Sequence, residues 1–284
     1  IETTNRTPVG PTDVTDAAAS GPGTDRDGEP TVSTDEADAD ATVSTDEADR
    51  AMTHGTDEDA TRVDPHVKIL NERVVARAKE RGLDVVVYAP HFIRLPEIRA
   101  RAERFSDDDL LVVPAREVFT GTWRNRRHVL AVGLSEPVPD FITLEGALAE
   151  FERQDAAVLA PHPGFLNVSL DPEDVRQYAD RVHAVETHNL KAFARQNRRA
   201  REIARDVDRP GFGSSYAHLR RSVGEVWTTF PERIDSEAAL VEALRDGAPR
   251  RVIRRRGARH TARALVEFAH LGYENSWGKI DRLF

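Results

Sequence analysis

The sequence has no cysteine and a single methionine, Met52. The absence of cysteine excludes disulfides, thiolate metal sites and cysteine nucleophiles, so any metal ion must be held by histidine and carboxylate side chains. No apolar run approaches the roughly 18 residues that a transmembrane helix needs, and no segment has the basic start and apolar centre of a secretory signal. We therefore expect a soluble, cytoplasmic protein with no membrane partner.

Large apolar side chains are also scarce in residues 1–61, which are rich in Asp, Glu, Ser, Thr and Ala. Such a segment cannot bury enough apolar surface to offset the entropy lost on ordering, so we expect a disordered acidic tail. Its string TVSTDEADAD at Thr31 is nearly repeated as TVSTDEADR at Thr42, a compositional pattern that needs no fold. Two interpretations stay open: a genuine solvating tail, or a stretch upstream of a translation start at Met52.

The charge balance reverses when the tail is left out. The whole chain has a formal net charge of −9, but its acidic excess lies in the tail, so residues 62–284 are mildly basic. A mildly basic domain is compatible with an anionic substrate, although such a balance is also ordinary for a soluble domain. Arginine greatly outnumbers lysine; this suits bidentate phosphate contacts, but codon usage is the simpler explanation.

From Val63 onward, short valine-rich runs alternate with amphipathic segments, which is the pattern of β/α units with a mostly parallel sheet. The expected strands are 63–69, 84–88, 110–114, 128–134, 156–160, 182–187, 210–215, 223–230 and 251–254. Apolar residues at helical spacing predict helices that include 144–151, 190–207 and 261–272. The sequence therefore predicts one α/β domain over residues 62–284, either a barrel or a doubly wound sheet.

Several histidines fall at the ends of these expected strands. His66, His91, His162 and His218 lie within or just after a strand, where the active sites of β/α barrels are built. His128 and Glu117 flank the loop between the third and fourth strands. Imidazole and carboxylate groups are ligands that zinc, manganese and iron accept, so this pattern indicates a metal site.

The order of short motifs resembles the polymerase-and-histidinol-phosphatase (PHP) family over residues 63–230. The motifs, in chain order, are DPHVKI at Asp64, YAPHF at Tyr88, REVFTG at Arg116, HVLAVGL at His128, APHPGF at Ala160, VETHN at Val185, SSYAH at Ser214 and VGEVWTTF at Val223. The resemblance implies a distorted (β/α)7 barrel that holds up to three metal ions at the C-terminal ends of its strands and hydrolyses phosphate esters. The positions that match the family's metal ligands are His66, His91, Glu117, His128, His162 and His218.

Three positions depart from the family's pattern. Lys68 stands where the second histidine of His-x-His belongs, Pro90 where an aspartate precedes His91, and Tyr216 where a ligand aspartate precedes His218. By the resemblance, one metal keeps a full ligand set of Glu117, His128 and His162. A second keeps only His66 and Glu117, and a third only His91 and His218. We therefore expect one or two divalent ions of zinc, manganese or iron.

Three further side chains are expected to act on the phosphate. Residues two apart in a strand share a face, so the Lys68 ammonium should lie beside His66 and point towards Glu117, where it could replace the charge of a missing metal. Arg127 follows Arg124 and Arg126 in the loop before His128 and could hold phosphate oxygens. Asn189, in VETHN, matches a polar position that lies close to the site in the family.

These residues favour a metal-dependent phosphoesterase that acts on a phosphorylated small molecule, a nucleotide or an RNA end. The alternative is a catalytically degenerate barrel that binds metal or phosphate as a regulatory module, and the three substitutions support it. A metal hydrolase with a non-phosphate substrate would use the same residues. The basic run RRVIRRRGAR at Arg250 could contact nucleic acid or phosphate, although a solvated strand edge is the better explanation. The sequence leaves the oligomeric state open.

Overall fold

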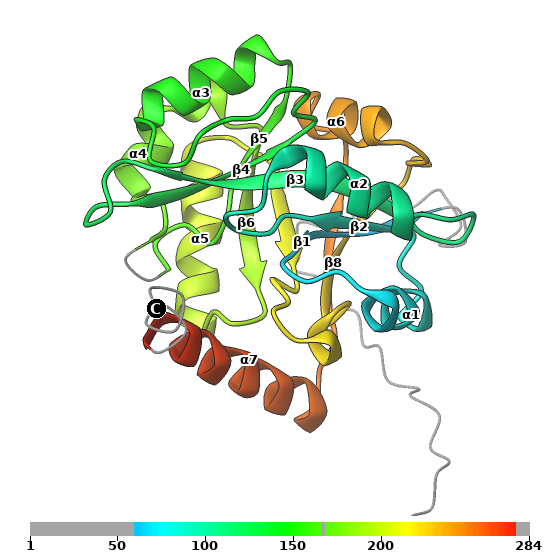
Figure 1. Ribbon diagram of the computed structural model, residues 1–284. Coiled ribbons are helices and arrows are strands. Elements are labelled where there is room, and N and C mark those ends of the chain that lie inside the picture. Colours follow the sequence, from blue (N-terminus) through cyan, green and yellow to red (C-terminus); the bar gives the residue numbers. More distant parts are fainter. Residues whose placement is uncertain (1–59, 166–167, 277–284) are drawn as a thin grey trace, which may run out of the picture. The chain divides into compact units, whose positions relative to one another are not determined.

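Nine strands form one sheet in the computed structural model, which describes residues 60–276 except 166–167. Along the sheet their order is β7-β6-β5-β4-β3-β2-β1-β8-β9 (Figure 1). The strands are β1 (Thr61–Val67), β2 (Val85–Tyr88), β3 (Leu111–Thr120), β4 (Arg127–Val132), β5 (Ala157–Ala160), β6 (Ala184–Asn189), β7 (Gly211–Ser214), β8 (Val226–Phe230) and β9 (Arg251–Arg254). Every expected strand is present, most of them shorter than predicted. The tail and the Met52 hypothesis lie outside the described residues, and β1 already begins at Thr61.

The sheet is mixed, whereas the β/α pattern predicts mostly parallel pairing. β1–β2, β2–β3, β5–β6 and β6–β7 are parallel, but β3–β4, β4–β5, β1–β8 and β8–β9 are antiparallel. The reason lies in β3, which continues to Thr120 and turns directly into β4 without a helix between them. Glu117 therefore lies inside a strand, paired with Leu130, rather than beside a loop as expected.

The two sides of the sheet approach each other and nearly close a barrel. After β7, Ala217 forms a parallel bridge with Val67 of β1, and its carbonyl oxygen accepts the backbone N–H of Lys68 at 3.0 Å. On the other side, the hydroxyl of Thr228 in β8 exchanges hydrogen bonds with the backbone of Gly213 in β7, at 2.9 and 3.0 Å. The predicted barrel is thus confirmed as a distorted one.

The helices lie around the sheet (Figure 1). They are α1 (Glu72–Glu80), α2 (Leu95–Phe105), α3 (Leu144–Arg153), α4 (Pro172–Gln177), α5 (Ala194–Asp206), α6 (Glu237–Arg245) and α7 (Ala258–Ser276), with short 3-10 turns at Ala179–Arg181 and Arg220–Ser222. Sequence signals mark several of their ends. The side chain of Thr143 accepts the N–H of Gly146 at the start of α3, and Gly82, with φ of 67°, takes the left-handed turn after α1.

Alternate residues of each strand pack on opposite sides of the sheet. One buried cluster consists of side chains from a single face of β1 to β8, including Val63, Val113 and Phe212. These side chains pack against Leu240 and Leu244 of α6, which closes one end of the barrel. The opposite faces pack against α3 and α5 in one cluster and against α1 and α2 in another. This alternation places the side chain of Glu117 on the same face as Val113, inside the barrel.

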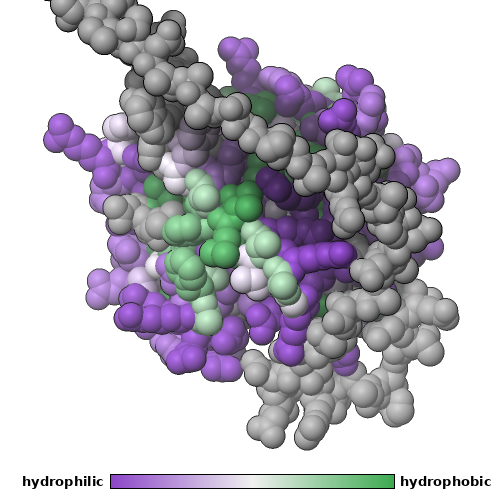
Figure 2. Space-filling view, turned by 90° about the horizontal axis from the view of Figure 1, so that it is seen from below, coloured by the Kyte–Doolittle hydropathy of each residue, from purple (hydrophilic) through white to green (hydrophobic). Residues whose placement is uncertain are grey.

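α7 lies across the end of the barrel at which the parallel strands finish. Its Glu267 accepts backbone N–H groups of His218 and Leu219, which follow β7. Viewed from this side, the surface shows a patch of apolar residues surrounded by hydrophilic ones (Figure 2). Leu265 and Val266 of α7 are among the exposed large apolar side chains. Within residues 60–276, apart from the gap at 166–167, none of the helices is both long and apolar enough to span a membrane.

Candidate metal centre

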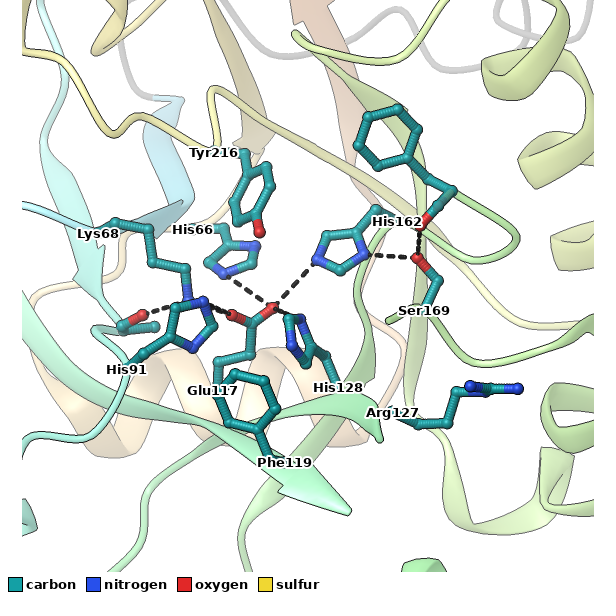
Figure 3. Close-up of polar contacts among 12 residues, drawn as sticks. His66, Lys68, His91, Glu117, Phe119, Arg127, His128, His162, Ser169 and Tyr216 are labelled. Atoms are coloured by element: carbon teal, nitrogen blue, oxygen red, sulfur yellow. Dashed lines mark hydrogen bonds and ion pairs between the residues drawn. The ribbon is translucent and has the colours of Figure 1, made fainter. Parts of the chain in front are cut away.

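Glu117 of β3 lies at the centre of a group of four imidazole rings (Figure 3). Its Oε1 is 3.0 Å from His162 Nε2, 3.2 Å from His128 Nδ1 and 3.5 Å from His66 Nε2, and its Oε2 is 3.0 Å from His91 Nε2. The Glu117 side chain is fully buried. A buried carboxylate surrounded by ring nitrogens is the donor set of a transition-metal site.

The four histidines come from different strands that end at the same edge of the barrel. His66 lies in β1, His91 follows β2, His162 follows β5, and His128 begins β4, which is antiparallel to β3 and so starts where β3 ends. The C-terminal ends of barrel strands thus bring together residues that are far apart in the sequence. Of the six ligands predicted from the sequence, Glu117 and these four histidines lie close together.

The possible ligands fall into two groups that share Glu117. One is His66, Glu117 and His162, and the other is His91, Glu117 and His128. The resemblance implied one full ligand set of Glu117, His128 and His162. In the structure, His162 lies in the first group and His128 in the second. The rings of His66 and His162 are stacked 5.9 Å apart at an interplanar angle of 16°, which is why they converge on one side of the carboxylate.

His162 provides the test of whether a metal ion fits the first group. The Ser169 hydroxyl donates to the carbonyl oxygen of Phe165, so towards His162 Nδ1, 2.9 Å away, it acts as acceptor. Nδ1 therefore carries the proton, and in the neutral ring Nε2 presents a lone pair to Glu117 Oε1 at 3.0 Å. Two lone pairs at this distance repel, and either a metal ion beside both or a second proton on the ring would remove the repulsion. The group fits a divalent ion, with Ser169 fixing the tautomer as outer partners of metal-bound histidines do.

The other rings also offer nitrogens that lack a hydrogen bond. Both nitrogens of His66 and both of His128 are buried, and so is Nδ1 of His91, and none of the five has a hydrogen-bond partner among the described residues. Burial, together with the charge of Lys68, lowers the pKa of His66 to about 3, and the same causes lower the pKa of His91 well below its ordinary value. Neutral imidazoles with free lone pairs are metal ligands.

Lys68 lies where the sequence predicts it, beside His66 and directed towards Glu117. Its Nζ donates to Glu117 Oε2 and, at 2.6 Å, to the carbonyl oxygen of Ala89. Burial alone would raise the pKa of Glu117, but the charge of Lys68 and the surrounding histidines hold that pKa well below its ordinary value, while burial lowers the pKa of Lys68. The ammonium contacts the same oxygen as His91, so it competes with an ion in the second group.

Tyr216 separates His218 from the Glu117 cluster. The ring of Tyr216 lies 4.6 Å from that of His66, 4.8 Å from that of His162 and 4.9 Å from that of His218. His218 is in neither ligand group, and its Nδ1 contacts Nζ of Lys191, an ammonium that lies 3.9 Å above the Tyr216 ring. The sequence did not single out Lys191, because a lone lysine after a strand carries no distinctive signal.

Two residues of this centre have backbone conformations that cost energy. His162 has φ of 35° and Tyr216 has φ of 45°, in the left-handed region that residues other than glycine seldom adopt. Glu186, which is buried, accepts the backbone N–H of His162 at 2.6 Å and so holds this conformation. Such strain persists where the surroundings impose it, and it gathers at functional sites.

The two remaining predicted site residues lie around this cluster. The Asn189 side chain donates to Glu186 at 3.1 Å and accepts the N–H of Lys191 at 2.9 Å, so both ends of its amide are engaged within the protein. Arg127 forms an ion pair with Asp171 at 2.8 Å and points away from the Glu117 cluster (Figure 3).

The sequence missed Ser169, Glu186 and Lys191 as parts of the site. Of the three, only Glu186 lies within a quoted motif, VETHN, which was the available signal.

Comparisons with known proteins agree with this fold. Residues 194–249 match the model of a PHP-associated family. The structure of PsfC from Pseudomonas syringae is similar with a TM-score of 0.57 and 17% identity, covering 75% of this chain and 98% of that one. A two-domain protein from Bacteroides vulgatus, described as containing a predicted PHP-like metal-dependent phosphoesterase, is similar with a TM-score of 0.52 and 19% identity, covering 73% and 69%. No curated protein matches the sequence. At these identities the solved structures show a shared fold.

Proposed function

We propose that this chain is a metal-dependent phosphoesterase of the PHP type. The observation that carries the proposal is the group of His66, Glu117 and His162, in which Nε2 of His162 lies 3.0 Å from a carboxylate oxygen of Glu117. The Bacteroides vulgatus protein that shares the fold is described as PHP-like and metal-dependent, which supports the same chemistry.

The three side chains of the first group would hold one zinc, manganese or iron ion. Three protein ligands leave a coordination position open, as in catalytic rather than structural sites. When bound there, the ion would lower the pKa of a water molecule from about 15.7 to about 7 and polarise a phosphoryl oxygen. Ser169 holds the His162 ring in the tautomer that such binding needs.

Lys68 would bind the phosphate group. An ammonium has three N–H donors, and two of them go to Glu117 and to the carbonyl oxygen of Ala89. No third hydrogen-bond acceptor for Lys68 is found in the described part of the chain, so the remaining N–H can donate to a phosphate oxygen. In this position Lys68 supplies positive charge on the side of Glu117 where the second ligand group lies.

The remaining candidates take supporting parts. His91 and His128 would act as ligands of a weaker second ion or as hydrogen-bond donors to the phosphate and the leaving group. Arg127 would have to leave Asp171 to reach the substrate, and because the Asp171 side chain is 60% exposed, that pair costs little to break. Asn189 would act through Glu186, by holding the backbone of His162 in place. Small phosphomonoesters, nucleotides and RNA ends all remain candidate substrates.

A regulatory module that binds metal or phosphate without turnover is the second candidate. Lys68 favours it, since its ammonium contacts the Glu117 oxygen that an ion in the second group would need. A site with one ion fewer than its family could retain binding while losing catalysis.

Elemental analysis of the protein purified without chelator tests the proposal. We expect about one tightly held transition ion per chain, lost in Glu117→Gln and retained in the matched control Glu232→Gln, whose side chain is exposed. Release of phosphate from ribose 5-phosphate, or of p-nitrophenol from bis(p-nitrophenyl) phosphate, in manganese then separates the two candidates. A bound ion without any turnover would favour the regulatory module, and a wild-type protein that takes up no ion would reject the phosphoesterase and the metal-binding form of the module.

A further inference from the structure

A continuous series of aromatic side chains leads from the candidate metal centre to the surface. Phe119 of β3 lies edge-on to His128, with ring centroids 4.3 Å apart, and 4.9 Å from His91. Phe92 is stacked on Phe119 at 4.8 Å, with an angle of 8° between the rings. The innermost ring of the series therefore touches two of the candidate ligands.

The outer members of the series are exposed. Phe141 lies 5.9 Å from Phe119, and Trp123 lies 5.7 Å from Phe141. Phe92 is 51% exposed, Phe141 40% and Trp123 56%, while Phe119 beneath them is buried. Four large rings gathered beside the candidate metal centre, three of them in contact with solvent, are typical of a surface that binds a ligand.

Two of these residues are held in an unfavourable backbone conformation. Phe92 has φ of 55° and Phe141 has φ of 65°, which bulky residues rarely adopt. Phe141 is kept there by its own N–H, which donates to the carbonyl oxygen of Phe119 at 2.6 Å. Among the described residues, six other than glycine have a positive φ. Four of them lie in or beside this site: Phe92, Phe141, His162 and Tyr216. The surrounding structure therefore holds strained backbone at the positions that present these rings.

The same entrance carries positive charge. The β3–β4 loop holds Arg124 and Arg126, and Arg127 begins β4, with no acidic residue between β3 and β4. The Arg126 guanidinium lies 4.9 Å from the centre of the Trp123 ring. Exposed rings together with guanidinium groups suit a ligand that is both planar and anionic, because bases stack on aromatic side chains and arginine attracts phosphate.

We propose that Phe92, Phe119, Phe141 and Trp123, here called the aromatic rim, bind the base of a nucleotide whose phosphate lies at the Glu117 cluster. The position of the phosphate rests on the proposed function, whereas base stacking rests on the rim alone. A sugar phosphate has no aromatic face and would leave the rim uncovered. Stacking tolerates every base, so the rim selects nucleotides as a class.

Calorimetric titration of the full chain with AMP, adenosine and ribose 5-phosphate tests this assignment. We expect AMP to bind more tightly than ribose 5-phosphate. Phe92→Ala or Trp123→Ala should each lower the affinity for AMP and for adenosine by about tenfold. Neither variant should change the affinity for ribose 5-phosphate. Phe193→Ala, which removes a ring of similar exposure (54%) outside the rim, is the matched control and should change nothing. Equal affinities for AMP and ribose 5-phosphate, with no effect of either rim variant, would overturn the proposal.

Two further measurements separate the rim from the proposed function and identify the source of the nucleotide. Adenosine binding that depends on Phe92, in a protein that releases no phosphate from any ester, would support the rim and reject the phosphoesterase. Phosphate release from ribose 5-phosphate without any rim-dependent adenosine binding would support the phosphoesterase and reject the rim. A 5′-phosphorylated oligoadenylate that binds more tightly than AMP would support the rim as a site for strand ends, and equal affinity would support it as a site for free nucleotides.

Discussion

Ser169 determines which nitrogen of His162 faces Glu117. Its hydroxyl proton goes to the carbonyl oxygen of Phe165, so its oxygen accepts the Nδ1 proton of His162 at 2.9 Å. Replacing it by alanine removes that acceptor and frees the ring to take the other tautomer. We expect Ser169→Ala to weaken transition-metal affinity by about 10- to 100-fold, the usual effect of losing such a partner. Competition with a chromophoric chelator measures this, with the exposed Ser135→Ala as control, and unchanged affinity would contradict the tautomer argument.

Lys68 is the residue whose replacement should change the number of bound ions. Its ammonium contacts the Glu117 oxygen that lies 3.0 Å from His91. Lys68→His restores the His-x-His spacing and replaces a cation by a possible ligand, so the group of His91, Glu117 and His128 becomes available. Elemental analysis should show a rise from about one ion to about two per chain. Lys79→His, at a partly exposed helix position, is the control, and a folded Lys68→His protein with unchanged metal content would show that Lys68 does not exclude an ion.

At the scale of elements, buried Glu225 ties the C-terminal helix α7 to the barrel. Its carboxylate lies 3.1 Å from Arg81 at the end of α1 and 2.9 Å from His260, and it also contacts Arg263, the latter two from α7. Glu225→Gln removes the charge that all three partners share. We expect the free energy of unfolding at pH 7 to fall by about 3 kcal/mol, as when one member of a buried ion pair is lost. Urea unfolding measures it, and Glu232→Gln, with its exposed side chain, should have little effect.

The same carboxylate predicts how acid destabilises the protein. Burial alone would raise the pKa of Glu225, but the hydrogen bond with His260 and the charges of Arg263 and Arg81 lower that pKa below its ordinary value of 4.5. A carboxyl with a lower pKa in the folded state adds stability above its unfolded pKa, and this contribution is lost as the pH falls through the folded value. Below about pH 4.5, the wild type should therefore lose stability more steeply than Glu225→Gln. Parallel slopes in urea unfolding at several pH values would contradict the assignment.

The elements themselves were largely predictable, and the exceptions have a physical cause. Valine-rich runs and helical spacing located each strand and the helices α3, α5 and α7, because local patterns determine which segments bury one face. The direction of pairing was not predictable for β4, since the sequence between Thr120 and Arg127 does not distinguish a hairpin from a longer crossover. Closure through the bridge of Val67 and Ala217 depends on residues far apart in the chain.

For the whole molecule, the sequence predicted which residues lie near one another at the candidate site. It did not predict which histidines lie together on one side of Glu117. The motifs of the sequence contain Glu117 and the four histidines around it, and the four histidines each lie near the end of a recognisable strand. Which histidines converge on the same side of Glu117 depends on the tilt of strands within the distorted barrel, and the sequence does not encode that tilt locally. The exclusion of His218 depends on the ring of Tyr216, whose position follows from a left-handed backbone at φ of 45°. Both features arise only when the barrel closes.

A site assembled from strands throughout the barrel couples metal binding to the stability of the whole domain. His66 and His162 are separated in sequence by β2 to β5, so unfolding would disperse these candidate ligands and release a bound ion. An ion at 100 times its dissociation constant stabilises the folded state by about 2.7 kcal/mol, which for a domain of this size raises the melting temperature by about 5–10 °C. Thermal unfolding with and without added zinc or manganese should show this rise in the wild type and none in Glu117→Gln. An equal rise in the variant would mean that the ion binds elsewhere and that Glu117 is not its ligand.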